Sequence, residues 1–305
     1  MKILITGATG LVGSALAKTL QGAGHTICRL VRPGTTGSAS AASTGFDVKW
    51  DPTTGELAGA AVGGDAVVNL AGASIAGGRW TTERKQLLRS SRIDSTRALV
   101  SAVAKMAIRP RVLVSASATG FYGDRGDDLL DESSASGTGF LSDIARDWEA
   151  EALKAESLGI RVALARFGII LSTHGGALPQ MMHPFQFGLG GKLGSGQQWM
   201  SWITLQDVCG ILQLAIENNA VRGPINVVSP QPVRNAEFTV ALARAMHRPA
   251  IFAAPAFALR LALGEMADQL LLSSQRVQPA QLSRLGYKFV YPELQSALAE
   301  VLREN

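Results

Sequence analysis

Close to its N-terminus the chain reads Lys2-Ile3-Leu4-Ile5-Thr6-Gly7-Ala8-Thr9-Gly10-Leu11-Val12-Gly13. The first five of these residues are mainly apolar or β-branched and predict a short buried strand that ends at the glycine. From Leu11 onward apolar residues recur at helical spacing, and residues 26–31 again have the pattern of a strand. A strand, a glycine turn, a helix and a second strand in this order form a βαβ unit, which predicts a parallel sheet.

Each glycine of the turn has a distinct predicted role. Gly7 allows a sharp turn, Gly10 lets the backbone approach a pyrophosphate, and Gly13 lets the helix pack closely on the strand. The free N–H groups at the start of the helix favour a phosphate there, so we expect Thr9, Leu11 and Val12 to contact the cofactor too. The spacing alone is a weak signal, but inside a βαβ unit it favours a dinucleotide site over a turn without a ligand.

The end of the second strand distinguishes between two dinucleotides. An acidic residue there would bind the ribose 2′-hydroxyl of NAD. The chain instead reads Arg29-Leu30-Val31-Arg32, and Arg32 is placed to pair with a 2′-phosphate. The sequence therefore favours NADP(H), unless Arg32 only points into solvent.

The rest of the chain continues the alternation of strands and helices. Strands are predicted at 67–72, 112–115 and 160–167, a single long helix at 81–106 with Leu87 facing inward, and another helix at 140–158. This order is typical of an α/β protein with a Rossmann-like, doubly wound parallel sheet. Downstream we expect a long glycine-rich functional loop at 175–199, then a strand, a helix and a strand, and finally helices at 235–246, 257–272 and 291–303.

These patterns predict two units. Residues 1–172, with about 200–230, would form the NADP-binding Rossmann domain. Residues from about 173 to 199 and from 231 to 305 would form a substrate-side loop and a smaller, mainly helical C-terminal domain.

Composition excludes several other classes of protein. Apolar residues make up 47% and the net charge is +5, but the basic residues are dispersed, so we expect no nucleic-acid partner. The longest apolar stretch, 251–264, is interrupted by Pro255 and Arg260 and predicts no membrane span. The two cysteines lie in apolar runs, and the four histidines lack metal-site spacing. We therefore expect no metal and a reducing, cytoplasmic compartment; the oligomeric state stays open.

Taken together, the motifs resemble those of the atypical extended short-chain dehydrogenases/reductases, and more narrowly the "epimerase family" proteins that end in a small helical domain of unassigned function. The resemblance runs along nearly the whole chain. The segments that carry it are Thr6 to Gly13, Trp50-Asp51-Pro52, Val68-Asn69-Leu70-Ala71-Gly72, Gly78-Arg79-Trp80, Ser115 to Gly123, Arg166-Phe167-Gly168, Gly194-Ser195-Gly196, Trp199 to Ile203 and Gly264-Glu265-Met266.

The resemblance implies further positions around the cofactor. It places Leu70, Ala71 and Gly72 along the cofactor channel and Phe167, Gly168 and Ile169 near the nicotinamide. We also count Ser115 among the cofactor-binding residues. The loop at 175–203 and the C-terminal helices would close the substrate cleft.

The catalytic residues of the wider superfamily are only partly present. Active members use a serine or threonine, a tyrosine that exchanges a proton, and a lysine four residues further on, facing the same cleft. Ser117 matches the serine, but Leu141 and Ala145 stand where the tyrosine and lysine belong. Tyr122 is the remaining candidate for a proton donor, with aromatic packing as its alternative role.

The substrate side also departs from the family pattern. Relatives that act on nucleotide sugars usually hold the diphosphate with an arginine where this chain reads Gln197-Gln198-Trp199-Met200. Trp199 and Trp202 would wall a more apolar pocket unless they are core residues, and Arg79 is a candidate anion holder unless it is simply solvated.

Three functions fit these observations. The first is an NADP-dependent oxidoreductase that acts on a small carbonyl-type substrate without the tyrosine–lysine pair. The second is an NADP(H)-binding sensor or scaffold without turnover. The third, a nucleotide-sugar epimerase, needs the missing tyrosine and is least favoured.

Overall fold

The computed structural model describes residues 1–32, 46–57 and 63–303. Eight strands form its main sheet, in the spatial order β13-β8-β6-β5-β1-β2-β3-β4. Neighbouring strands are parallel except for β3 and β4, which are antiparallel. The bounds are β1 (Lys2–Thr6), β2 (Thr26–Val31), β3 (Phe46–Asp51), β4 (Glu56–Leu57), β5 (Ala66–Asn69), β6 (Val112–Ala118), β8 (Arg161–Phe167) and β13 (Gly223–Val227).

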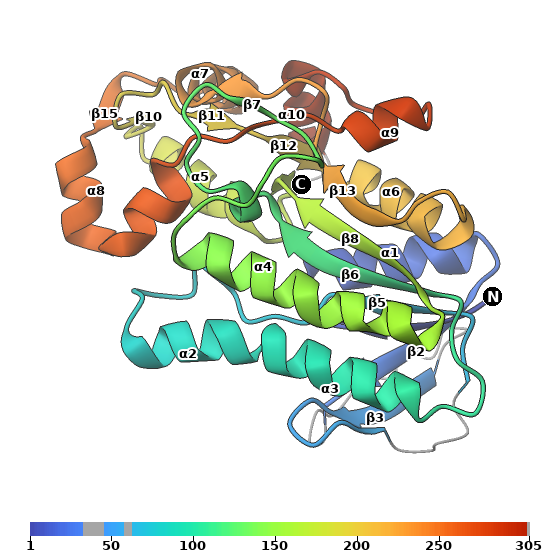
Figure 1. Cartoon of the computed structure of the whole chain (residues 1–305). Helices are drawn as coiled ribbons and strands as arrows, with labels where there is room; N and C mark the ends of the chain where they lie inside the picture. The colour runs from blue at the N-terminus through green and yellow to red at the C-terminus, as the bar shows by residue number, and fades with distance from the viewer. Residues whose placement is uncertain (33–45, 58–62, 304–305) are drawn as a thin grey trace.

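Helices cover both faces of this sheet (Figure 1). Helices α1 (Leu11–Gly22) and α6 (Leu205–Glu217) pack on one face, and α3 (Ile93–Ala104) and α4 (Phe140–Leu153) on the other. Alternation along β1 shows why: Ile3 and Ile5 belong to the first core and Leu4 to the second. The predicted doubly wound sheet is confirmed, and β1 lies between β2 and β5, where the order of strands reverses.

The C-terminal part of the chain forms a further, mainly helical layer beyond the carboxyl ends of β6 and β8 (Figure 1). Helices α5 (Ala177–Gln186), α7 (Asn235–Met246) and α10 (Leu294–Arg303) share a separate apolar core. Four separate two-stranded sheets complete the structure: β9 (Ile169–Leu171) with β12 (Trp202–Thr204), β10 (Gly191–Leu193) with β15 (Phe252–Ala254), β11 (Trp199–Met200) with β14 (Val233–Arg234), and β7 (Leu129–Leu130) with β16 (Arg276–Val277).

The prediction of one helix over 81–106 is wrong, because the helix is broken into α2 (Thr82–Ser90) and α3. At the break, the Ser91 hydroxyl accepts a hydrogen bond from the backbone N–H of Ala73, and Arg92 adopts φ −110°. The break changes which residues face the core. Leu87, predicted to point inward, is 47% exposed, whereas Leu88 is fully buried.

The prediction of a loop over 175–199 is also wrong, because this segment contains α5. Leu178, Met182 and Phe185 are four and three residues apart, and all three are buried in the C-terminal core. This helical periodicity outweighs the glycines around the helix and the proline inside it.

The predicted helix at 257–272 is likewise two pieces, α8 (Ala256–Leu263) and a π-helical segment, η3 (Ala267–Leu271). Gly264 separates them, and its φ of +64° is one that L side chains rarely adopt. Three other short helical segments are η1 (Thr119–Tyr122), η2 (Lys154–Leu158) and α9 (Ala280–Arg284).

Candidate functional site

The glycine turn after β1 brings the backbones of two neighbouring strands into contact. Gly7 has φ +67°, and a Cβ atom there would lie 2.7 Å from the carbonyl carbon of Leu70. The Thr6 hydroxyl donates to Asn69 Oδ1 at 2.7 Å and accepts from the backbone N–H of Leu70 at 3.1 Å. A side chain at position 7 would therefore separate the ends of β1 and β5.

The start of α1 offers free donors to an anion. Its N-cap, Gly10, has no side chain to bind the N–H groups of the first turn. Thr9 is exposed, while Leu11 and Val12 are half-buried. A Cβ on Gly13 would lie 2.2 Å from the carbonyl oxygen of Gly7, so helix and turn approach closely only with glycine there. This uncapped helix start, held against a turn without side chains, fits the pyrophosphate of a dinucleotide.

The other residues predicted along the cofactor channel lie near this turn. Leu70 and Ala71 are half-buried and Gly72 is exposed. Ser115 lies in the core and is 1% exposed, and its hydroxyl accepts a hydrogen bond from Asn69 Nδ2 at 3.3 Å. Ser115 therefore contacts the side chain of Asn69, at the end of β5, from within the core.

Arg32 is exposed at the end of β2. The neighbouring strand β3 carries Asp47, but this carboxylate is bound by Arg29, with 2.6 Å between Nε and Oδ1. The Asp47 carboxylate therefore already forms an ion pair with Arg29.

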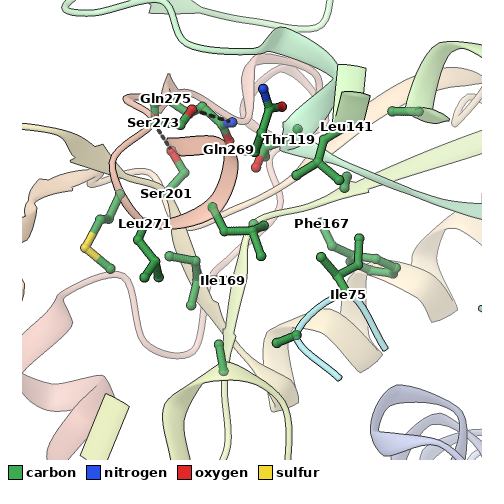
Figure 2. Close-up of a pocket in the computed structure, with 18 of the residues that line it drawn as sticks. Ile75, Thr119, Leu141, Phe167, Ile169, Ser201, Gln269, Leu271, Ser273 and Gln275 are labelled. Atoms are coloured by element: carbon green, nitrogen blue, oxygen red, sulfur yellow. Dashed lines mark hydrogen bonds between the residues drawn. The ribbon is translucent and has the colours of Figure 1, made fainter. Parts of the chain in front are cut away.

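A cavity of about 430 Å³ lies between the carboxyl ends of the strands and the C-terminal layer. Figure 2 shows Phe167 and Ile169 on its walls, as the resemblance implies for the nicotinamide end. The lining is mainly apolar. It consists of Ser74, Ile75, Ala76, Arg92, Ala118, Thr119, Gly120, Leu141, Ile144, Ala145, Trp148, Phe167, Gly168, Ile169, Gly176, Ala177, Met181, Leu193, Trp199, Met200, Ser201, Asn235, Gln269, Leu270, Leu271, Ser273 and Gln275.

The two positions aligned with the tyrosine and the lysine both face this cavity. Leu141 and Ala145 lie one turn apart on α4 and line its wall. Neither side chain carries a polar atom, so this wall cannot exchange a proton with a ligand.

Ser117 and Tyr122, the two residues proposed for catalysis, do not line the cavity. Both are buried in a polar network that connects three neighbouring strands. The Ser117 hydroxyl donates to Glu149 Oε1 at 2.6 Å, and the Tyr122 hydroxyl donates to Asn226 Oδ1 at 2.7 Å. Arg166 binds Glu149 with two hydrogen bonds of 2.8 Å and also donates to the Tyr122 hydroxyl.

This network weakens the interpretation of Tyr122 as a proton donor. Burial raises the pKa of Tyr122 to about 12, against the smaller opposing effect of Arg166. The side chain is fully buried and packs edge-on against Phe121, with 5.4 Å between the ring centroids. The alternative role that we considered, aromatic packing at the strand end, fits this geometry.

Polar groups that the sequence did not single out line the cavity instead. Thr119 lies at the start of η1 and Gln269 on η3, and both line the cavity (Figure 2). Ser201 lies further along the wall, where its hydroxyl donates to the backbone carbonyl of Gln275 at 2.8 Å. Thr119 belongs to the same motif as Ser117, but β6 ends between them, at Ala118. The sequence pattern did not indicate this strand end, and so it did not indicate that Thr119, and not Ser117, lines the cavity.

The three residues predicted on the substrate side are dispersed. Trp199 lines the cavity, and its indole N–H donates to Asp127 Oδ1 at 2.9 Å. Trp202 is fully buried in the C-terminal core and donates to the carbonyl of Gln231, so the core alternative fits it. Arg79 is exposed and does not line the cavity.

A membrane-spanning helix and a metal-binding cluster are both absent from the part of the chain that the structure describes. None of its helices is long and apolar enough to cross a membrane. Among the same residues, no group of three or more histidine, cysteine, aspartate or glutamate side chains could hold a metal ion.

The sheet, the glycine turn and the cavity at the carboxyl ends of the strands define a protein of the dinucleotide-binding Rossmann type. Two family models match the chain. One, described as the NAD dependent epimerase/dehydratase family, matches residues 3–228, and one described as a domain of unknown function (DUF1731) matches residues 254–301. The chain therefore belongs to the NAD dependent epimerase/dehydratase family, as an atypical extended short-chain dehydrogenase/reductase.

Similar proteins are found in bacteria and in humans. The chain is 44% identical to the epimerase family protein MT2273 of Mycobacterium tuberculosis, over 97% of this chain and 96% of that one. It is 41% identical to the epimerase family protein SAOUHSC_00792 of Staphylococcus aureus, over 99% of each. The crystal structure of human epimerase family protein SDR39U1 (isoform 2) with NADPH shares 32% identity and a TM-score of 0.88, with 100% of both chains covered.

Proposed function

We propose that the protein binds NADP(H) and reduces or oxidises a small carbonyl-type substrate in the 430 Å³ cavity without a tyrosine–lysine pair. The observation that carries this proposal is the close approach of Gly7 and Gly13, which leaves the start of α1 open to a pyrophosphate. The NADPH in the structure of human SDR39U1 supports the choice of dinucleotide.

Arg32 is the residue that we propose for the choice of NADP(H) over NAD(H). It is exposed at the end of β2, where a 2′-phosphate would lie next to the adenine ribose. Because Arg29 already neutralises Asp47, that acid does not compete for Arg32. A guanidinium binds a phosphate with two parallel, charge-assisted hydrogen bonds.

The bound cofactor would supply or accept a hydride, and the chain would position the carbonyl group. Thr119 and Gln269 line the same cavity as Leu141, so they are the polar groups that we propose for binding the carbonyl oxygen. Since Leu141 and Ala145 cannot move a proton, water is the proton source in this proposal. Phe167, Gly168 and Ile169 would contact the nicotinamide.

A second candidate function, an NADP(H) sensor or scaffold without turnover, is favoured by one observation. The cavity wall that carries the proton-transfer residues in active relatives is apolar here, and Tyr122 and Ser117 are bound elsewhere. The third candidate, a nucleotide-sugar epimerase, lacks the tyrosine that its reaction needs.

Two further proposals concern the chain as a whole. Residues 1–172 with about 200–230 would bind the cofactor, and the remaining C-terminal segments would cover the substrate. The free cysteines Cys28 and Cys209 are both buried, which supports a reducing, cytoplasmic compartment.

The test of the proposal is a fluorescence titration of the purified protein with NADPH and NADH, alongside Arg32→Ala. We expect micromolar binding of NADPH, weaker binding of NADH, and loss of at least about tenfold preference in the variant, since one charged hydrogen bond is worth about 1.5–3 kcal/mol. Consumption of NADPH with a panel of aldehydes, ketones and enones then separates the oxidoreductase from the sensor. Equal or absent binding of both cofactors would contradict the proposal.

A further inference from the structure

Arg92 is a buried cation on the wall of the cavity. It follows the break between α2 and α3, and only 9% of it is exposed. Its Nη2 donates to the carbonyl of Ala73 at 2.9 Å, and its Nη1 donates to the carbonyl of Leu88 at 3.3 Å. These backbone groups hold the guanidinium in place, but they do not neutralise its charge.

Two neighbouring arginines on the same helices have acidic partners. Arg89 binds Asp147 at 2.6 Å, and Arg97 binds Glu151 at 2.8 Å. Within residues 1–32, 46–57 and 63–303, no carboxylate oxygen lies within 4.0 Å of a nitrogen of Arg92. A buried charge without a counterion is costly, so the site as described is electrostatically incomplete.

A second arginine adds to this positive charge. The Arg84 guanidinium donates to the carbonyl of Ser74, a cavity residue, and its buried Nε has no hydrogen-bond partner among the described residues. Burial, and to a lesser extent the charge of Arg84, lower the pKa of Arg92 to about 10. Arg92 therefore stays charged at neutral pH, and its surroundings favour an added anion.

The position of Arg92 relates it to the missing lysine. Its guanidinium carbon lies 5.4 Å from the centroid of the Trp148 ring, three residues beyond Ala145 on α4. A Cβ placed on Gly72 would lie 3.2 Å from the same carbon. Arg92 thus places a positive charge between the cofactor channel and the wall from which the lysine is missing.

We propose that Arg92 is the anion-binding residue of the cavity and takes the carboxylate or phosphate oxygens of the ligand that fills it. The inference rests on the proposed function in treating this cavity as the ligand site. The oxygens come either from a phosphate of the cofactor or from an acidic group on the substrate. A guanidinium binds either of them through two parallel hydrogen bonds.

The experiment compares the wild type, Arg92→Gln, Arg92→Lys and a matched control, Arg97→Gln, which removes an exposed arginine from the same helix. The dissociation constant of NADPH is measured by nicotinamide fluorescence. Benzoate and inorganic phosphate are then titrated calorimetrically into each NADPH-saturated protein at constant ionic strength. Thermal melts confirm that each variant is folded.

Either of two results supports the proposal. If the cofactor supplies the anion, Arg92→Gln raises the dissociation constant of NADPH at least tenfold, while Arg92→Lys raises it less and the control leaves it unchanged. If the substrate supplies it, NADPH binding is equal in all four proteins, and benzoate or phosphate binds the wild type at least tenfold more tightly than Arg92→Gln.

The proposal is wrong if NADPH affinity is equal in all four proteins and neither probe distinguishes the wild type from Arg92→Gln. If Arg92→Gln does not fold, Arg92→Lys replaces it, and loss of the planar fork is expected to weaken binding at least threefold relative to the control. If the wild type binds no NADPH, the probes are titrated into the free proteins. Binding of a probe at least tenfold more tightly by the wild type than by Arg92→Gln would then refute the proposed function while leaving this inference intact.

Discussion

Replacing Gly13 by alanine tests the geometry of the glycine turn most directly. The new Cβ would lie 2.2 Å from the carbonyl oxygen of Gly7 and 2.8 Å from the Cα of Ala8, whereas ordinary contacts begin at 3.4 Å. Both atoms belong to the backbone, so the helix or the turn must move by about 1 Å, a shift typical of overpacking that costs about 1–3 kcal/mol. For a chain of 305 residues, 2 kcal/mol corresponds to a decrease in melting temperature of about 3 °C.

The same displacement moves the first N–H groups of α1 away from the expected position of the pyrophosphate. Loss of one such hydrogen bond, about 1.5 kcal/mol, would weaken NADPH binding about tenfold. The assays are thermal unfolding followed by circular dichroism and a fluorescence titration with NADPH.

Gly22→Ala is the matched control, because it lies at the other end of the same helix and a Cβ there meets no atom of the described residues within 4 Å. Helix propensity predicts that it is neutral or stabilises the protein by up to about 1 kcal/mol. If Gly13→Ala melts and binds NADPH as Gly22→Ala does, the turn is not as closely packed as we describe and our argument for the cofactor site is refuted.

Two other predictions follow from the polar contacts. Tyr122→Phe removes the hydroxyl that accepts from Arg166 Nη1 and donates to Asn226 Oδ1, so we expect a loss of about 1–3 kcal/mol in unfolding free energy and unchanged NADPH affinity. Loss of turnover at unchanged stability would instead identify Tyr122 as the proton donor. Although burial raises the pKa of Glu151, hydrogen bonds from Lys154 and Arg97 outweigh it and hold this pKa below its usual value. The ionised form of Glu151 thus stabilises the fold above about pH 4.3, and this stabilisation is lost as the pH falls through the lowered pKa. The free energy of unfolding, measured in urea between about pH 5 and 3, should therefore depend less on pH in Glu151→Gln than in the wild type.

The fold could be predicted from the sequence wherever the signal was local. The strand Lys2–Thr6, the helix Leu11–Gly22 and the strand Thr26–Val31 have the predicted bounds, because apolar periodicity and glycines define each end. The helix Asn235–Met246 also has the predicted bounds, which follow from its apolar periodicity.

The predictions that are wrong involve distant contacts. The break between α2 and α3 places Ser91 against the backbone of Ala73, eighteen positions away in the chain. Nothing in residues 81–106 indicates that such a partner exists, so periodicity alone predicts one helix. Arg92 was missed for the same reason, since its burial against Trp148 depends on the packing of α3 on α4.

The polar network also explains why a sequence motif pointed to Ser117 and Tyr122. Arg166 on β8 donates hydrogen bonds to Glu149 on α4 and to the Tyr122 hydroxyl. The Tyr122 hydroxyl in turn donates to Asn226 on β13. These bonds join three neighbouring strands, since β6, β8 and β13 lie side by side in the sheet.

Because Glu149 and Arg166 are both almost fully buried, each needs the other, and removing one would leave an unpaired charge in the core. Ser117 and Tyr122 form hydrogen bonds with this pair, so their hydroxyl groups have a structural role. A ligand in the cavity would instead meet Thr119, Gln269 and the charge of Arg92. In the reaction that we propose, these groups would bind and orient the ligand, and water would supply the proton.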